Sequence, residues 1–212
     1  MSIVLSELHY LPSISFFQQL LTADSLLLDA HEHYHKQTYR NRCLVLTAQG
    51  PQPLTVPVLD GNRSEKIRTS EIEIDYRQNW PHRHFRTLQT AYNASPYFGY
   101  YADYLQDIYA QKYVRLWDLN LAMLHLLLRC LRWPLPIAFT TEYLAPAGSS
   151  PSTLPLSDRR DVLTPKISPR SAEPDSTSQQ PYPQVFGPGF VPGLSVLDLL
   201  FMQGPAAGRW LS

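Results

Sequence analysis

Cysteines, net charge and long apolar runs are all scarce in this sequence. Cys43 and Cys130 are the only cysteines among 212 residues, a number too small for a disulfide scaffold and typical of a protein kept reduced in the cytoplasm. Basic and acidic residues balance at 18 each, which disfavours a broad basic surface for nucleic acid. The longest apolar stretch, LNLAMLHLLLRCL, is shorter than a membrane span and carries His125 and Arg129. We therefore expect a buried helix there and no membrane span.

Familiar targeting and catalytic motifs are missing as well. Met1 leads directly into SIVLSELHY without a basic opening, so the sequence predicts no secretory leader. It contains no P-loop, GxGxxG, GxSxG, HExxH or paired CxxC motif. The common nucleotide-binding and hydrolase sites are therefore not indicated.

The apolar runs that are present predict an α/β fold that begins with a βαβ unit. Residues 3–10 (IVLSELHY) and 25–30 (SLLLDA) have the composition of strands, and ISFFQQLLTA between them has helical spacing. Such a unit is parallel and right-handed. Residues 42–47 and 52–59 flank the turn signal AQGP and predict an antiparallel edge hairpin. The expected architecture is a small parallel or mixed sheet with this hairpin and a layer of helices.

Composition divides the chain into three segments. Residues 1–146 form the expected α/β core, with a weaker strand at 66–75 and a late strand at 137–143. Residues 147–181 are rich in Pro, Ser, Thr and Gln and predict a flexible loop, because they offer too little apolar surface to order themselves. Residues 182–212 regain apolar side chains, with a helix over 194–202, and we expect this tail to dock back onto the core. Further helices are expected at 81–93, 97–111 and 116–131.

The stretch HEHYHKQTYRNRC, residues 31–43, concentrates polar side chains. In an extended chain His31, His33 and His35 point the same way, and they can share a zinc ion with His9 or Asp29 as a further ligand. The simpler interpretation is the solvated face of an edge strand. Histidine clusters without Cys or a helical spacing are weak motifs, so we expect no metal.

Other polar residues in this region allow several kinds of chemistry. Arg40 and Arg42, with Asn41 between them, can hold an anionic group or can form surface ion pairs. Cys43 with His84 can form a nucleophile–base pair, although a cysteine in a strand is more often a small buried residue. His84 borders the apolar face of its predicted helix. A half-buried histidine there can act as a general base, or it can be a structural residue whose ring is hydrogen-bonded within the protein.

Several spaced blocks resemble the WbqC-like family. ELHYLPSISFF is similar to the N-terminal segment of that family, and KQTYRNRC, LTVPV, the Trp80–His84 helix start and AYNASPYFGYY look like its later blocks. The tail YPQVF…GFVPGLSVLDLLFMQGP is similar to its C-terminal block. Glu7 and Leu8 stand where the family usually has Gln-Pro, and Gly193 stands where Asn is common. The family occurs among bacterial surface-polysaccharide genes, including O-antigen clusters, and a role as a glycine transferase has been suggested for it.

The resemblance implies a transferase that attaches a glycine-like amino acid or an acyl group to a sugar, and the few cysteines together with the missing leader motif predict a cytoplasmic location. His84 and His9 are then the candidate proton acceptors, and Lys36 is a candidate for binding the donor or the oxyanion. The alternative is a non-catalytic module that binds a nucleotide sugar or a partner enzyme. The expected partner is a small molecule, with no nucleic acid, and no particular cofactor or oligomeric state is indicated. The candidate substrate-binding residues are Tyr10, Tyr39, Asn41, Arg42, Tyr92, Tyr182 and Gln184.

Overall fold

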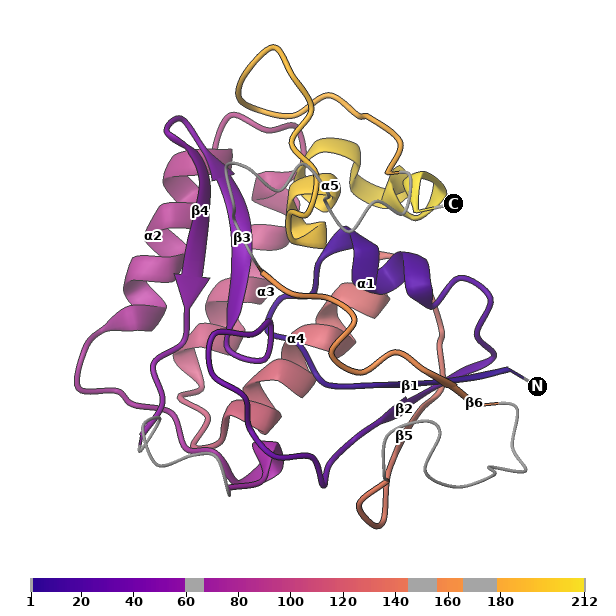
Figure 1. Cartoon of the computed structure of the whole chain (residues 1–212). Helices are drawn as coiled ribbons and strands as arrows, with labels where there is room; N and C mark the ends of the chain where they lie inside the picture. Colours follow the sequence, from indigo (N-terminus) through magenta and orange to yellow (C-terminus); the bar gives the residue numbers. More distant parts are fainter. Residues whose placement is uncertain (1, 60–66, 145–155, 166–178, 212) are drawn as a thin grey trace.

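The protein has two separate sheets and a layer of helices (Figure 1). The computed structural model describes residues 2–59, 67–144, 156–165 and 179–211. A four-stranded sheet has the strand order β5-β2-β1-β6, and a two-stranded sheet pairs β3 with β4. The predicted α/β class is confirmed, but the hairpin forms its own sheet instead of an edge of the parallel one.

The chain opens with the predicted βαβ unit. β1 (Ile3–Ser6) and β2 (Ser25–Leu28) pair in parallel, with Ile3 opposite Ser25. Between them lies α1 (Ile14–Gln19), whose N-cap residue Ser13 accepts a hydrogen bond from the backbone N–H of Phe16 at 3.3 Å. Val4, Phe17 and Leu26 of this unit are buried in the main core.

Two further parallel strands extend the sheet on both sides. β5 (Ile137–Phe139) pairs with β2, and β6 (Leu156–Asp158) pairs with β1. β6 lies within the Pro/Ser-rich segment 147–181, so the structure places a strand inside a stretch for which composition predicts a loop. Because all four strands are parallel, their carboxyl ends meet at one edge of the sheet.

The hairpin packs between a helix and the C-terminal tail. β3 (Arg42–Thr47) and β4 (Gly50–Thr55) are antiparallel, and Gly50 turns the chain with a φ of 99°. Leu44 and Leu46 form a small apolar cluster with Leu194 of the tail. Figure 1 shows the other side of the hairpin next to α2 (Trp80–Tyr92).

Three helices supply most of the remaining core. α2, α3 (Phe98–Ala110) and α4 (Leu116–Cys130) follow one another, and α4 buries the apolar stretch that was predicted to be a core helix. No helix in the described part of the chain is long and apolar enough to cross a bilayer. The strand predicted at 66–75 is wrong: within residues 67–75, Thr69–Glu71 is a short 3-10 helix and only isolated bridges surround it.

The C-terminal tail docks onto the start of the chain, as predicted. α5 (Val196–Gln203) continues into a 3-10 helix, Gly204–Trp210. Backbone N–H groups of Val196 and Ile14 donate to Pro12 and Leu194 at 3.0 and 3.1 Å. Ser195 caps α5 with its side chain, and its backbone N–H donates to Leu44 of the hairpin at 2.8 Å. The tail therefore ties the βαβ unit to the hairpin.

Candidate functional site

Charged residues gather where the parallel strands end. Glu7 follows β1, Asp29 follows β2, and Asp158 ends β6, so the topology itself brings three carboxylates to one edge of the sheet. In parallel sheets this edge is where ligands usually bind. We name the group the carboxyl-edge cluster; its members are Glu7, His9, Asp29, Glu32, Arg40, Asp158, Arg160 and Asp161.

Arg40 is the central cation of the cluster, and its side chain is only 1% exposed. Its Nε donates to Glu32 Oε1 at 2.8 Å, and a second guanidinium nitrogen donates to Glu32 Oε2 at 2.5 Å. Its remaining nitrogen lies 3.0 Å from Asp161 Oδ1. Asn120 of α4 donates to the backbone carbonyl of Arg40 at 2.7 Å, which fixes the backbone of Arg40. Arg40 therefore joins the segment after β2 to the segment after β6.

Glu7 and His9 form a second buried pair. His9 Nε2 lies 2.8 Å from Glu7 Oε1, and the backbone N–H of Asp161 donates to Glu7 Oε2 at 3.1 Å. Burial opposes the charge on Glu7, but His9 and Arg40 outweigh burial and lower the pKa of Glu7 to about 2. His9 Nδ1 is buried and has no hydrogen-bond partner in the described part of the chain. Glu7 therefore fixes the orientation of the His9 imidazole.

Arg160 closes the cluster on the β6 side. One guanidinium nitrogen lies 2.6 Å from Asp29 Oδ2 and 2.7 Å from the backbone carbonyl of Leu144, and another lies 2.7 Å from Asp158 Oδ2. Asp29 is fully buried and also accepts from Thr140 Oγ1 at 3.2 Å. The ends of β2, β5 and β6 are therefore linked through one arginine.

Burial affects the two partners of the Arg40–Glu32 pair differently. Burial raises the pKa of Glu32 to about 7, although Arg40 acts in the opposite direction. Burial lowers the pKa of Arg40, but its hydrogen bonds and charge interactions with Glu32, Glu7 and Asp161 outweigh burial and raise it overall. Arg40 therefore keeps its charge, whereas Glu32 exchanges a proton near neutral pH.

A cavity of about 160 Å³ opens beside these ion pairs, and we name it the carboxyl-edge cavity. Three carboxylates and one guanidinium contribute to its lining, so its wall has an excess of negative charge when Glu32 is ionised. Such a wall attracts an amine, and Arg160 supplies one positive group for a ligand carboxylate or carbonyl. The lining residues are Glu32, His33, His35, Tyr143, Asp158, Arg160 and Asp161.

Two of the three odd-numbered histidines lie at the same cavity. His33 and His35 line the cavity, whereas the backbone N–H of His31 donates to Asp29 at 3.0 Å. Within the described residues, no group of three or more His, Cys, Asp or Glu side chains is placed to hold a metal ion.

The other residues predicted near this stretch lie in different surroundings. Lys36 is exposed, and Arg42 is the first residue of β3. Asn41 donates to the backbone carbonyl of Val56 at 3.0 Å, which supports the hairpin. Tyr39 is buried with its ring centroid 5.4 Å from that of His9, so it packs against the cluster.

His84 lies in a separate aromatic pocket of the core. The Tyr10 hydroxyl is 2.9 Å from His84 Nδ1 and 2.6 Å from the Tyr109 hydroxyl, and His84 also makes a hydrogen bond to the backbone of Thr55. Burial lowers the pKa of His84 to about 4, so its ring is neutral at pH 7. Both ring nitrogens of His84 therefore already have hydrogen-bond partners inside the protein, and the Tyr10 hydroxyl is one of them. Cys43 is also buried, and burial raises the pKa of its thiol well above the usual value.

Tyr92, Tyr182 and Gln184 converge on another buried group, Asp198 of α5. Tyr92 donates to Asp198 Oδ1 at 2.8 Å and Tyr182 donates to Asp198 Oδ2 at 2.6 Å. The Gln184 amide lies 3.4 Å from the same Oδ2 and bonds to the backbone of Val191. These three predicted substrate-binding residues thus meet, but around a carboxylate that holds the tail against α2.

Of the predicted catalytic residues, only His9 belongs to the carboxyl-edge cluster. Asp158, Arg160 and Asp161 were not predicted from the sequence, because they lie in a segment whose composition resembles a loop. The pattern that could have indicated these residues is SDRRD, residues 157–161, a charged run that follows a short apolar stretch. Glu7 was noted only as a departure from the family pattern, and it proves to be a member of the cluster.

The fold and the cluster define an α/β protein with a charged site at the carboxyl edge of a parallel sheet. The model of the WbqC-like protein family matches residues 8–164 and 167–210, and the chain belongs to this family. The chain is 28% identical over 229 residues to the uncharacterized protein Rv1507c of Mycobacterium tuberculosis, with 99% of this chain and 96% of that protein covered. No solved structure matches the chain.

Proposed function

We propose that this protein is a cytoplasmic transferase that attaches a glycine-like amino acid or an acyl group to a sugar during bacterial surface-polysaccharide synthesis, including that of O-antigen. The main support for this proposal is the position of Glu32, a buried carboxylate that lines the carboxyl-edge cavity and is held by Arg40. Membership of the WbqC-like family supplies the expectation of a sugar substrate.

The charged lining of the cavity suits the proton transfer in such a reaction. An amine or hydroxyl on the acceptor attacks the activated carbonyl of the donor, a new C–N or C–O bond forms, and the bond to the leaving group breaks. The attacking atom must lose its proton in this step. A carboxylate with a pKa of about 7 is matched to accept that proton at neutral pH, and Glu32 has this property.

The remaining charged residues have complementary roles in this proposal. Arg160 faces the cavity and stabilises the negative oxygen that develops on the attacked carbonyl. Asp158 and Asp161 attract the amine of the substrate. His9, held by Glu7, is the second candidate proton acceptor, because its Nδ1 has no partner within the described residues.

The test is a transfer assay by mass spectrometry, with amino-sugar and sugar acceptors and glycyl or acyl thioesters as donors. We expect a mass gain of one glycyl or acyl group, with a rate that rises through a midpoint near pH 7. Glu32→Gln should reduce the rate by roughly 100-fold or more. The matched control is Glu73→Gln, because Glu73 is an exposed glutamate that does not line this cavity.

A non-catalytic binding module is the second candidate, favoured by the ion pairs that already engage Arg40 and Arg160 inside the protein. A nucleotide sugar or an amine would then stabilise the fold without turnover, by about 2.7 kcal/mol at one hundred times its dissociation constant. Transfer that survives in Glu32→Gln would reject the proposed role of Glu32. Stabilisation by a nucleotide sugar without any product would favour the binding module.

A further inference from the structure

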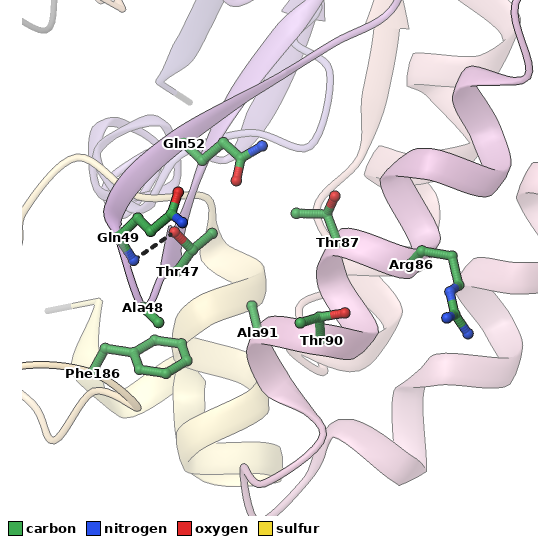
Figure 2. A pocket seen from close by; sticks show the side chains of 9 residues that line it. All are labelled: Thr47, Ala48, Gln49, Gln52, Arg86, Thr87, Thr90, Ala91 and Phe186. Carbon is green, nitrogen blue, oxygen red and sulfur yellow. Dashed lines mark hydrogen bonds between the residues drawn. The ribbon is translucent and has the colours of Figure 1, made fainter.

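A second cavity lies between the hairpin turn, α2 and the C-terminal tail. Its volume is about 350 Å³, at the lower end of the range for small-molecule sites. Figure 2 shows Gln49 and Gln52 on the hairpin side, Thr87 and Ala91 on α2, and the ring of Phe186 at one end. It shares no lining residue with the carboxyl-edge cavity. We name it the hairpin pocket.

The lining of the hairpin pocket combines neutral polar groups with one aromatic ring. Gln49, Gln52 and Thr90 have no intramolecular side-chain hydrogen bonds within the described part of the chain, so their amides and hydroxyl are available to a ligand. Thr87 donates to the backbone carbonyl of Arg83 at 2.9 Å and keeps its oxygen as an acceptor. No carboxylate is found among the lining residues that the structure describes. Neutral donors and acceptors around a ring match a ligand that carries several hydroxyl groups on an apolar body.

A peptide strand is a poor fit for the adjacent edge of the hairpin. Pro51 and Pro53 of β4 lie opposite Leu46 and Leu44 of β3. Proline has no N–H, so these pairs cannot be the hydrogen-bonded ones, and the backbone of both prolines faces the free edge of β4. That edge therefore lacks the donors at two alternate positions that an added strand would need. An added peptide strand is therefore not the expected ligand at this edge.

A phosphate group is also a poor fit. Arg86 is the one cation among the described lining residues, and it is exposed. Figure 2 shows its guanidinium group directed away from Gln52, Thr87 and Phe186. One of its nitrogens lies 3.4 Å from the side-chain oxygen of Gln89, outside the pocket lining. Phosphate sites usually combine hydrogen-bond donors with cations, and the described lining of the hairpin pocket directs no cation into it.

We infer that the hairpin pocket binds a neutral saccharide unit. The face of one sugar ring packs on Phe186, and its hydroxyl groups bond to the amides of Gln49 and Gln52 and to the hydroxyls of Thr87 and Thr90. The cavity volume accommodates a ring of this size. The inference does not rest on the proposed transfer reaction, since it follows from the lining of a different cavity.

The test is saturation-transfer NMR on the full chain without any donor, using the methyl glycosides of glucose, galactose, mannose and N-acetylglucosamine. Glucose 6-phosphate and a four-residue peptide are tested in the same way, as representatives of the phosphate and peptide ligands that the lining disfavours. We expect at least one neutral glycoside to bind, with the strongest transfer to the C–H face of its ring. Phe186→Ala should weaken binding roughly tenfold, since loss of an aromatic contact costs about 1 kcal/mol or more.

Gln52→Ala is the second variant, because Gln52 is exposed and its replacement leaves the apolar core intact. It should also weaken binding several-fold. Phe139→Ala, at an exposed phenylalanine on β5, is the matched control and should bind as the parent protein does. Binding by none of the four glycosides, equal binding in Gln52→Ala, or a preference for the phosphate or the peptide would overturn the inference.

Discussion

Arg40 and Glu32 form a two-point ion pair inside the protein, with Arg40 Nε 2.8 Å from Glu32 Oε1. Both side chains are nearly inaccessible, at 1% and 8% exposure. Arg40 also reaches Asp161, which lies far along the chain beyond β6. Arg40 therefore opposes the effect of burial on the pKa of Glu32, and it also holds the segment that completes the carboxyl-edge cavity.

The first prediction concerns the stability provided by this pair. Arg40→Met should lower the free energy of unfolding by about 3–5 kcal/mol, because buried Glu32 loses two hydrogen-bond donors and its counterion, and it must then take up a proton or stay charged without a partner. Urea denaturation at pH 7 measures the loss. Arg77→Met is the control, since Arg77 pairs with Asp75 on the surface and is 82% exposed. Equal effects of the two substitutions would contradict the structural role of Arg40.

The second prediction is a loss of stability in mild acid that depends on His84. Its pKa is about 4 in the folded protein, against 6.5 for an ordinary histidine. Between these values the unfolded chain binds the proton and the folded chain does not, so stability falls as the pH drops from about 6.5 to about 4. The full contribution is about 3 kcal/mol.

Urea denaturation across this pH range, in the parent protein and in His84→Gln, isolates the contribution of His84. The parent should lose more stability than the variant as the pH falls. His82→Gln is the control on the same helix, because His82 is exposed. An identical pH dependence in the parent and His84→Gln would rule out a buried neutral imidazole at this position.

The third prediction concerns the docking of the tail through Asp198. Tyr182→Phe should destabilise the protein by about 1.5–3 kcal/mol, because it removes a 2.6 Å hydrogen bond to a buried carboxylate. Tyr92→Phe should cost a similar amount and should also leave the backbone N–H of Leu46 without its partner. Thermal denaturation of Tyr100→Phe provides the baseline, since Tyr100 is 73% exposed. A Tyr182→Phe variant as stable as Tyr100→Phe would refute this role of Asp198.

The fourth prediction concerns Gly204, which follows α5. A β-carbon at this position would lie 2.5 Å from the ring of Tyr97, and the backbone φ is +54°. Gly204→Ala should therefore destabilise the fold by about 1–3 kcal/mol. Gly99→Ala, in α3, is the opposite control: nothing lies within 4 Å of an added β-carbon there, and alanine is the better helix former. Chemical denaturation should show opposite signs for the two substitutions.

Local patterns were sufficient for several elements. The continuous run SLLLDA and the helical spacing of ISFFQQLLTA predicted the βαβ unit, and AQGP between two apolar runs predicted the hairpin. These predictions succeeded because each depends on the residues of one short segment. Residues 67–75 were predicted wrongly because they alternate like a strand, whereas in the structure Val58, His33 and Arg115 each supply only a single bridge to this region.

The candidate site was predicted less completely than the fold. His9 lies in the carboxyl-edge cluster, whereas His84 lies in the core beside Tyr10, and their expected roles in catalysis stay predictions. Arg160 was missed because its partner Asp29 is 131 residues away, and no local pattern connects them. The parallel pairing of β6 with β1 is what brings Arg160 to Asp29.

The sequence by itself determined the α/β class, the opening βαβ unit, the hairpin, the buried helix over Leu116–Cys130 and the likeness to the WbqC-like family. Only the tertiary structure decided which charged residues share a site. Secondary structure follows from apolar periodicity within a few turns or one strand. The cluster depends on where four parallel strands end, and strand order is set by packing between segments that are distant in the chain. The same long-range packing gives Glu32 and His84 pKa values that neither residue would have in a peptide.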